Sequence, residues 1–101
     1  MKKLFNKICI ASDHAGYVLK EKIKDYLIDK SISVIDLGPF SEDSVDYPDY
    51  AKKVAKRLVF RKSDAGILVC GSGTGMAITA NKFKGIRAAQ CYNKISTILS
   101  R

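Results

Sequence analysis

The chain has 101 residues, of which 47% are hydrophobic and 28% charged, and it carries a formal net charge of +8 at pH 7. These values are typical of one modest globular domain spanning residues 1–101. Apolar runs stay well short of the roughly 18 residues of a membrane-spanning helix, so no membrane association is expected. The basic start is interrupted at Asn6 and Lys7, which argues against a secretory signal.

The positive charge favours an anionic partner, either a nucleic acid or a phosphorylated metabolite. The lysines, such as Lys20, Lys22 and Lys24, are spread over predicted helices and form no basic block interleaved with aromatic residues. We therefore expect no nucleic-acid partner, and we interpret these lysines mainly as solvated helix charges that also attract phosphate.

The three cysteines are widely spaced and odd in number, which fits neither a disulfide framework nor a metal site. They are expected to be reduced thiols of a cytoplasmic protein, with Cys9 inside the core.

The first half of the chain predicts a strand, a helix and a second strand. Residues 7–11 read as an apolar strand, and residues 12–16 as the loop that follows it. A helix is expected from Tyr17, because apolar residues recur at helical spacing. Residues 32–36 are rich in β-branched side chains and predict the second strand, before a loop at 37–47. The apolar face of this first helix is expected to consist of Leu19, Ile23, Tyr26 and Leu27.

The second half repeats this alternation. A helix is expected from Pro48 to about residue 62, since proline suits the first helical turn. Residues 65–70 read as a buried third strand, and residues 76–83 as a third helix. Residues 86–91 are predicted to form a short fourth strand, and residues 93–101 begin a further helix.

This alternation predicts an α/β fold, with a three-layer, Rossmann-like parallel sheet and helices on both faces. The expected strand order is 2-1-3-4, and the predicted elements end with the start of the helix after the fourth strand. Ligands bind such sheets at the carboxyl ends of the strands, where the strand order reverses. Residues 12–14 are therefore expected to lie beside residues 70–72.

A glycine-rich loop follows the third strand, with Gly71, Gly73 and Gly75 at alternate positions. Glycine lets a ligand approach the backbone closely, and the helix that follows favours an anion at its N-terminus. The spacing matches neither a P-loop nor a dinucleotide fingerprint. The alternative, a tight turn that only requires glycine, stays open at this point.

The predicted pocket combines the carboxylate of Asp13, the single histidine His14, the thiol of Cys70 and the amides of residues 71–75. A thiol beside a helix N-terminus is favoured as thiolate, so Cys70 is a candidate base for proton transfer next to a carbonyl. The amides are suited to stabilise an enediolate oxygen. His14, oriented by Asp13, is suited to donate to a phosphate or sugar oxygen. The simpler alternatives are a capping aspartate at Asp13 and an inert thiol at Cys70.

Four motifs, taken together and in order, resemble the ribose-5-phosphate isomerase B family of RpiB/LacAB sugar-phosphate isomerases. They occupy residues 11–16, 46–51, 66–76 and 80–89.

The resemblance implies reversible conversion of ribose 5-phosphate to ribulose 5-phosphate in the pentose phosphate pathway, through an enediolate and with no metal or organic cofactor. It implies that Cys70 is the catalytic base and that Ser72 occupies a catalytic position where members carry Thr or Ser. The implied substrate-binding residues are Asp13, His14, Tyr47, Gly71, Ser72, Gly73, Thr74 and Gly75.

The family resemblance also implies dimers or tetramers of dimers, so a homo-oligomer is expected. Members continue past residue 101 with a His-Asn motif whose histidine opens the furanose ring; His14 matches a different position, so we expect this chain to lack the ring-opening histidine. Two alternatives remain: a galactose-6-phosphate isomerase subunit, and a non-catalytic truncated remnant that binds sugar phosphate or a full-length partner.

Overall fold

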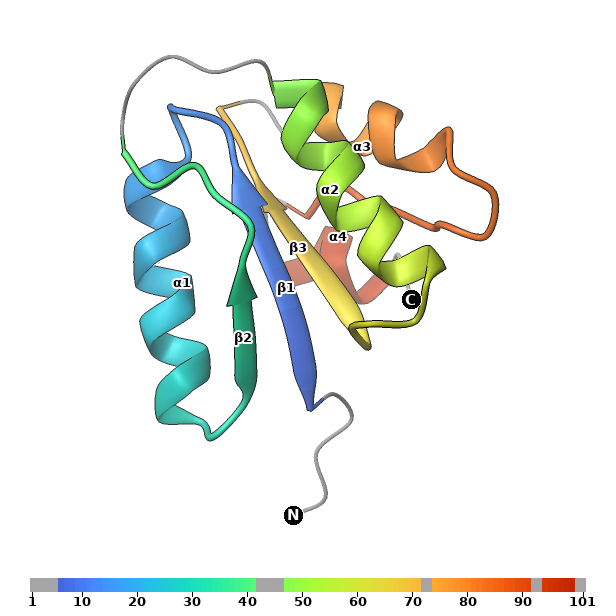
Figure 1. The fold of residues 1–101 in the computed structure, drawn as a ribbon. Helices are drawn as coiled ribbons and strands as arrows, with labels where there is room; N and C mark the ends of the chain where they lie inside the picture. Colours follow the sequence, from blue (N-terminus) through green and yellow to red (C-terminus); the bar gives the residue numbers. More distant parts are fainter. Residues whose placement is uncertain (1–5, 42–46, 72–73, 92–93, 100–101) are drawn as a thin grey trace.

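The computed structural model describes residues 6–41, 47–71, 74–91 and 94–99. Strands and helices alternate from residue 7 to residue 81, as the sequence pattern predicts (Figure 1). In order, the elements are β1 (Lys7–Ser12), α1 (Tyr17–Asp29), β2 (Ser33–Asp36), α2 (Tyr47–Val59), β3 (Ala65–Val69), α3 (Thr74–Asn81) and α4 (Lys94–Leu99).

The three described strands form a parallel sheet in the order β2-β1-β3. In the central strand, Ile10 is in register with Asp36 of β2 and with Ile67 of β3. Apart from Lys7, every residue of β1 is buried, because this strand is paired on both sides and covered on both faces. The predicted reversal of strand order between the first and third strands is confirmed.

Helices cover both faces of the sheet, which confirms the three-layer α/β fold. The strand order and right-handed crossovers place α1 on one face, and α2 with α3 on the other (Figure 1). On the α2 face, Cys9 and Ala11 of β1 pack with Val54, and all three are buried. Gly66 of β3 lies so close to this helix that a Cβ atom there would be 2.5 Å from Cγ1 of Val54.

The predicted fourth strand at residues 86–91 is wrong, since these residues form no strand in the structure. The side chain of Asn81, at the end of α3, bonds to the backbone of this segment. Its amide group donates to the Ala88 carbonyl at 2.9 Å, and its Oδ1 accepts from the Ala88 amide at 2.7 Å. Both backbone groups of Ala88 are therefore bonded to the end of α3.

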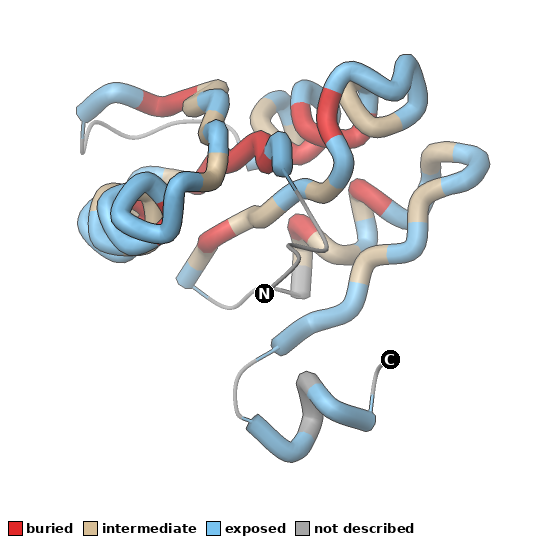
Figure 2. Tube along the Cα trace, turned by 90° about the horizontal axis from the view of Figure 1, so that it is seen from below, coloured by how far each residue is buried: buried red, intermediate tan, exposed pale blue. Residues whose placement is uncertain are grey.

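The helix α4 stands apart from the sheet (Figure 2). Its apolar side chains Ile95, Ile98 and Leu99 are 72%, 60% and 80% exposed. Among the described strands, β3 is paired on one side only. A cavity of about 510 Å³ lies along the open side of β3, between it and residues 86–91. No helix in the described part of the chain is long and apolar enough to cross a membrane.

We expect the isolated 101-residue chain to self-associate, because an unpaired strand edge and exposed apolar side chains favour pairing between copies. The solution mass, measured by light scattering over a range of concentrations, should rise with concentration. The variant Leu99→Glu should shift this association to higher concentration, whereas Lys22→Glu, on the exposed face of α1, should not. A concentration-independent monomer mass would contradict the expectation.

Candidate functional site

The carboxyl ends of the neighbouring parallel strands β1 and β3 lie at the same end of the sheet. Asp13 connects the two loops that follow these strands. Its backbone amide donates to the Val69 carbonyl at 3.1 Å, and its Oδ2 accepts from the Gly71 amide at 3.3 Å. The predicted convergence of the two loops is therefore confirmed.

The second oxygen of Asp13 braces the turn that leads into α1. Its Oδ1 accepts from the Gly16 amide at 2.7 Å, and α1 begins at the next residue. The N-cap of α1 is Gly16 and has no side-chain cap hydrogen bond, so the interpretation of Asp13 as the helix cap is wrong. Each carboxylate oxygen of Asp13 instead bonds to one of the two loops. This arrangement holds the carboxylate beside Gly71, the first residue of the glycine-rich loop.

Gly16 allows the first loop to lie directly against β3. A Cβ atom on Gly16 would be 2.5 Å from the carbonyl oxygen of Val69 and 2.7 Å from its carbonyl carbon. These distances are shorter than any real contact, and the obstacle is backbone rather than a flexible side chain. Glycine is therefore required at position 16 by the close approach of the two loops.

Tyr47 comes from a distant part of the sequence and lies over the start of α3. A Cβ atom on Gly75 would be 2.8 Å from three atoms of the Tyr47 ring, including its hydroxyl oxygen. Tyr47 is the first residue of α2 and is 41% exposed, as a residue at the rim of an open site would be. The structure therefore brings Tyr47 to the C-terminal end of the glycine-rich loop.

The structure describes some of the remaining predicted site residues fully and others only in part or not at all. Cys70 directly follows β3, is partly buried and lines the cavity beside Gly71. His14 lies in the exposed turn before α1, one residue after Asp13. Ser72 and Gly73 lie outside the described residues, and for Thr74 the structure describes only the backbone, at the first position of α3. The catalytic and binding roles of all these residues remain predictions.

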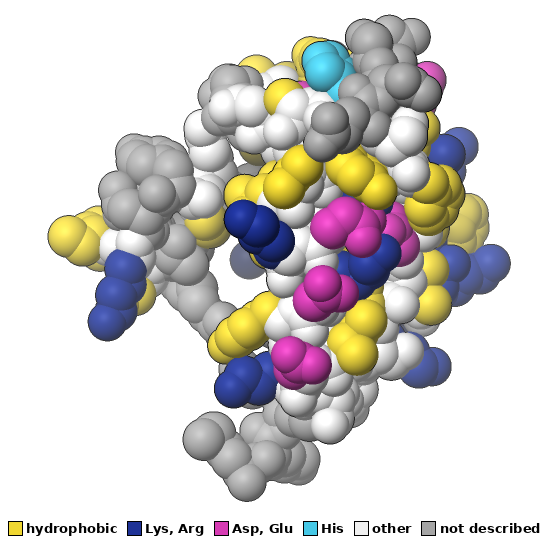
Figure 3. Space-filling view, turned by 90° about the vertical axis from the view of Figure 1, so that its left-hand side faces the viewer, with side chains coloured by type: hydrophobic (Ala, Val, Ile, Leu, Met, Phe, Trp, Pro, Cys, Tyr) yellow, Lys and Arg dark blue, Asp and Glu magenta, His cyan; other side chains and the backbone are white. Residues whose placement is uncertain are grey.

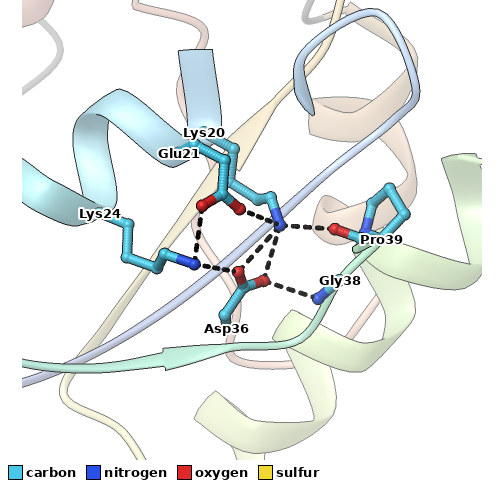
Figure 4. Close-up of polar contacts among 6 residues, drawn as sticks. All are labelled: Lys20, Glu21, Lys24, Asp36, Gly38 and Pro39. Atoms are coloured by element: carbon cyan, nitrogen blue, oxygen red, sulfur yellow. Dashed lines mark hydrogen bonds and ion pairs between the residues drawn. The ribbon is translucent and has the colours of Figure 1, made fainter. Parts of the chain in front are cut away.

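A buried charge near the site was missed by the sequence analysis. Lys20 is completely buried, so its interpretation as a solvated helix charge is wrong. Its ammonium donates to both carboxylate oxygens of Asp36, at 2.8 and 2.9 Å, and to the Pro39 carbonyl at 2.6 Å (Figure 4). Leu27, the other buried residue of α1, is seven residues further on, and this two-turn spacing was the available signal.

The prediction of which residues form the apolar face of α1 is only partly confirmed. Leu27 is buried, but Leu19 is 53% and Tyr26 61% exposed. Leu19 and Ile23 line the cavity beside β3 rather than the core under α1.

Lys20 belongs to a cluster of four charges at the end of β2. Lys24 contacts Asp36 and Glu21, each at 2.9 Å, and Glu21 also lies 3.4 Å from the Lys20 ammonium. Burial alone would raise the pKa of the Asp36 carboxyl, but hydrogen bonds from Lys20, Lys24 and the Gly38 amide outweigh it and hold that pKa below its usual value. The hydrogen bond with Glu21, followed by that with Asp36, raises the pKa of Lys24. Asp36 is therefore held as a carboxylate at neutral pH.

The outer face of α1 mixes charges of both signs. Basic and acidic side chains are interspersed over it (Figure 3), so this face is not a uniformly basic surface. Within the described ranges, no group of three or more His, Cys, Asp or Glu side chains is placed to hold a metal ion. The site offers a carboxylate, a thiol, backbone amides and a tyrosine, which are groups suited to proton transfer and to hydrogen bonding of a polar ligand.

Comparison with known proteins gives a consistent result. Residues 8–101 match the model of a family described as Ribose/Galactose Isomerase. The chain is 45% identical over 95 residues to the ribose-5-phosphate isomerase B of Escherichia coli (strain K12), covering 94% of this chain and 64% of that protein. It is 46% identical over 95 residues to the ribose-5-P isomerase B of Listeria innocua, with coverage of 94% and 64%.

Solved structures of ribose-5-phosphate isomerases are also similar to this chain. The ribose 5-phosphate isomerase of Thermotoga maritima superposes with a TM-score of 0.91 at 56% identity, covering 94% of this chain and 66% of that one. The ribose-5-phosphate isomerase B of Clostridium thermocellum gives a TM-score of 0.92 at 48% identity, with coverage of 94% and 64%. The chain thus spans slightly less than two thirds of the length of these relatives.

Proposed function

The chain belongs to the ribose/galactose isomerase family, and from this premise we propose that it acts as an aldose–ketose isomerase interconverting ribose 5-phosphate and ribulose 5-phosphate. The observation that carries the proposal is the junction of the two loops, in which Asp13 binds the Gly71 amide directly beside Cys70. Relatives named for ribose 5-phosphate, in both sequence and structure, favour this substrate over galactose 6-phosphate.

The reaction needs only proton transfer between neighbouring carbons. In the proposed mechanism the Cys70 thiolate removes the proton from the carbon next to the aldehyde, which gives an enediolate. The same proton is returned to the former carbonyl carbon, while a proton moves between the two oxygens. Because the substrate is oxidised at one carbon and reduced at its neighbour, the atoms and electrons balance without a redox cofactor or metal.

The other predicted residues hold the substrate in this proposal. Amides from Gly71 onward stabilise the enediolate oxygen, since donors fixed in advance are most effective where charge develops. Asp13, His14 and Tyr47 bind the sugar phosphate at the rim. Ser72, at the catalytic position named by the family resemblance, is proposed to assist Cys70.

Opening of the furanose ring is proposed to require a group other than His14. His14 is the single histidine of the 101 residues, and the family resemblance assigns it to substrate binding. We therefore expect slow turnover of ribose 5-phosphate, which is cyclic, and faster turnover of ribulose 5-phosphate, which has an open chain.

The proposal is tested by assaying the chain with ribose 5-phosphate, ribulose 5-phosphate and galactose 6-phosphate at equal concentration, together with calorimetric binding of each. Turnover of the pentose phosphates, faster from ribulose 5-phosphate, is the expected result. Faster turnover of galactose 6-phosphate would overturn the substrate assignment. Binding without turnover would instead identify a non-catalytic sugar-phosphate binder.

The structure and the sequence also support a proposal on the oligomeric state and the cellular compartment of the enzyme. The exposed apolar side chains of α4 and the unpaired side of β3 support assembly into a homo-oligomer. Each chain would contribute one isomerase domain, which is shorter than the domain of its relatives. The odd number and wide spacing of the cysteines, with Cys9 buried in the core, support a reducing compartment such as the cytoplasm.

A further inference from the structure

We propose that Lys20 is a positioning residue of the sugar-phosphate site: its buried ammonium fixes the loop after β2, and through that loop the backbone that carries Asp13. This inference rests on the proposed function for its substrate, but the geometry that it describes is testable without one.

The position of Lys20 is unusual for a lysine. Its side chain is fully buried, and its ammonium lies between the rings of Tyr17 and Phe40, at 5.1 and 5.4 Å from their centroids. A buried ammonium is costly unless it is paired and hydrogen-bonded. Here its partners are the Asp36 carboxylate and the Pro39 carbonyl, on a segment 16 to 19 residues away. The lysine therefore ties α1 to the residues that follow β2.

The segment held by Lys20 is bonded directly to the first site loop. Asp36 also accepts from the Gly38 amide at 2.9 Å, so its carboxylate holds both the lysine and the turn. The Gly38 carbonyl then accepts from the Ser12 amide at 3.1 Å. Ser12 immediately precedes Asp13, which binds Val69 and Gly71. A path of hydrogen bonds joined by the backbone of Gly38 and by the Ser12–Asp13 peptide bond thus runs from Lys20 to the amide beside Cys70.

The same segment also touches the helix that carries Tyr47. A Cβ atom on Gly38 would be 3.1 Å from Cε1 of Tyr50, in the first turn of α2. The segment that Lys20 holds therefore contacts Ser12, the residue before Asp13, and Tyr50, which lies one helical turn from Tyr47.

A role in stability alone does not account well for this arrangement. Replacing a buried ion pair with apolar residues is often neutral or stabilising, whereas removing one partner is costly. The polar bonds of Lys20 do something that an apolar residue cannot, because they hold a backbone carbonyl and a carboxylate at fixed positions. Such exact placement matters at the sugar-phosphate site, because small displacements of a binding group weaken binding and slow catalysis.

The test compares Lys20→Met with the double variant Lys20→Met/Asp36→Asn, and uses Lys22→Met on the exposed face of α1 as the matched control. In Lys20→Met the Asp36 carboxylate keeps Lys24 and the Gly38 amide as partners but loses both hydrogen bonds from the buried ammonium. The double variant also removes the charge of that carboxylate, so its stability to urea should return toward that of the unchanged chain. KM for ribulose 5-phosphate should nevertheless stay about tenfold higher in both Lys20 variants, with a smaller change in kcat, because Asp13 and Tyr47 bind the sugar while Cys70 is held by β3. NMR shifts of the Asp13 and Gly71 amides should move in both variants and stay unchanged in Lys22→Met.

Each outcome is decisive. If the double variant regains both its stability and the KM of the unchanged chain, Lys20 has only a structural role and the proposal fails. If the amide shifts of Asp13 and Gly71 do not move, the proposed hydrogen-bond connection is wrong. If the unchanged chain neither binds nor converts the sugar phosphate, the proposed function fails, while the amide shifts still decide whether Lys20 positions the loop.

Discussion

Replacing Cys70 with alanine is expected to lower the turnover of ribulose 5-phosphate by about 10²–10⁴-fold, the usual contribution of a general base. Cys70 follows the last residue of β3 and lines the cavity beside Gly71, whose amide Asp13 binds. Loss of its thiol removes the proposed proton carrier but leaves these backbone contacts in place. Initial rates measured beside circular dichroism spectra test this expectation.

Cys91→Ala is the matched control, because Cys91 is an exposed thiol that lines the same cavity but has no proposed role in the reaction. Its rate should equal that of the unchanged chain. Full activity of Cys70→Ala would exclude Cys70 as the base. Thiol labelling gives a second check: Cys9 should react slowest, because it is fully buried and burial raises its pKa, which disfavours the reactive thiolate.

Replacing Gly16 with alanine is expected to destabilise the fold by about 1–3 kcal/mol or more, the range for overpacking a closely packed position. The added methyl group would overlap the Val69 carbonyl, which also accepts the Asp13 amide. Neither backbone can move without separating the two loops that make the site. The free energy of unfolding, measured by urea denaturation, should fall, and the binding of sugar phosphate should weaken with it.

Gly71→Ala provides the control for this steric argument. A Cβ atom there would meet only Cβ of Ala15 at 3.5 Å, an ordinary contact. Its effect on stability should therefore stay within about 0.5 kcal/mol, as for most substitutions that disturb no packing. Equal losses in the two variants would show that the contact of Gly16 with Val69 is not what makes glycine necessary.

The sequence alone determined the parts of the structure that depend on local periodicity and on chain order. Apolar runs with β-branched residues identify β1 and β3, and helical spacing identifies α2, because burial of one face imposes a fixed repeat on the residues. The alternation of the two types then requires a parallel sheet whose order reverses between β1 and β3. That reversal places Asp13 beside Gly71 before any coordinates are known.

The tertiary structure alone decided the features that depend on a partner far away in the chain. Lys20 is buried because Asp36 and Pro39 supply acceptors for its ammonium, and no periodic pattern in α1 encodes those acceptors. Residues 86–91 have the composition of a strand, yet the Asn81 side chain takes the backbone groups of Ala88. A local pattern reports how apolar a segment is, but hydrogen-bond partners are assigned only when the whole chain has folded.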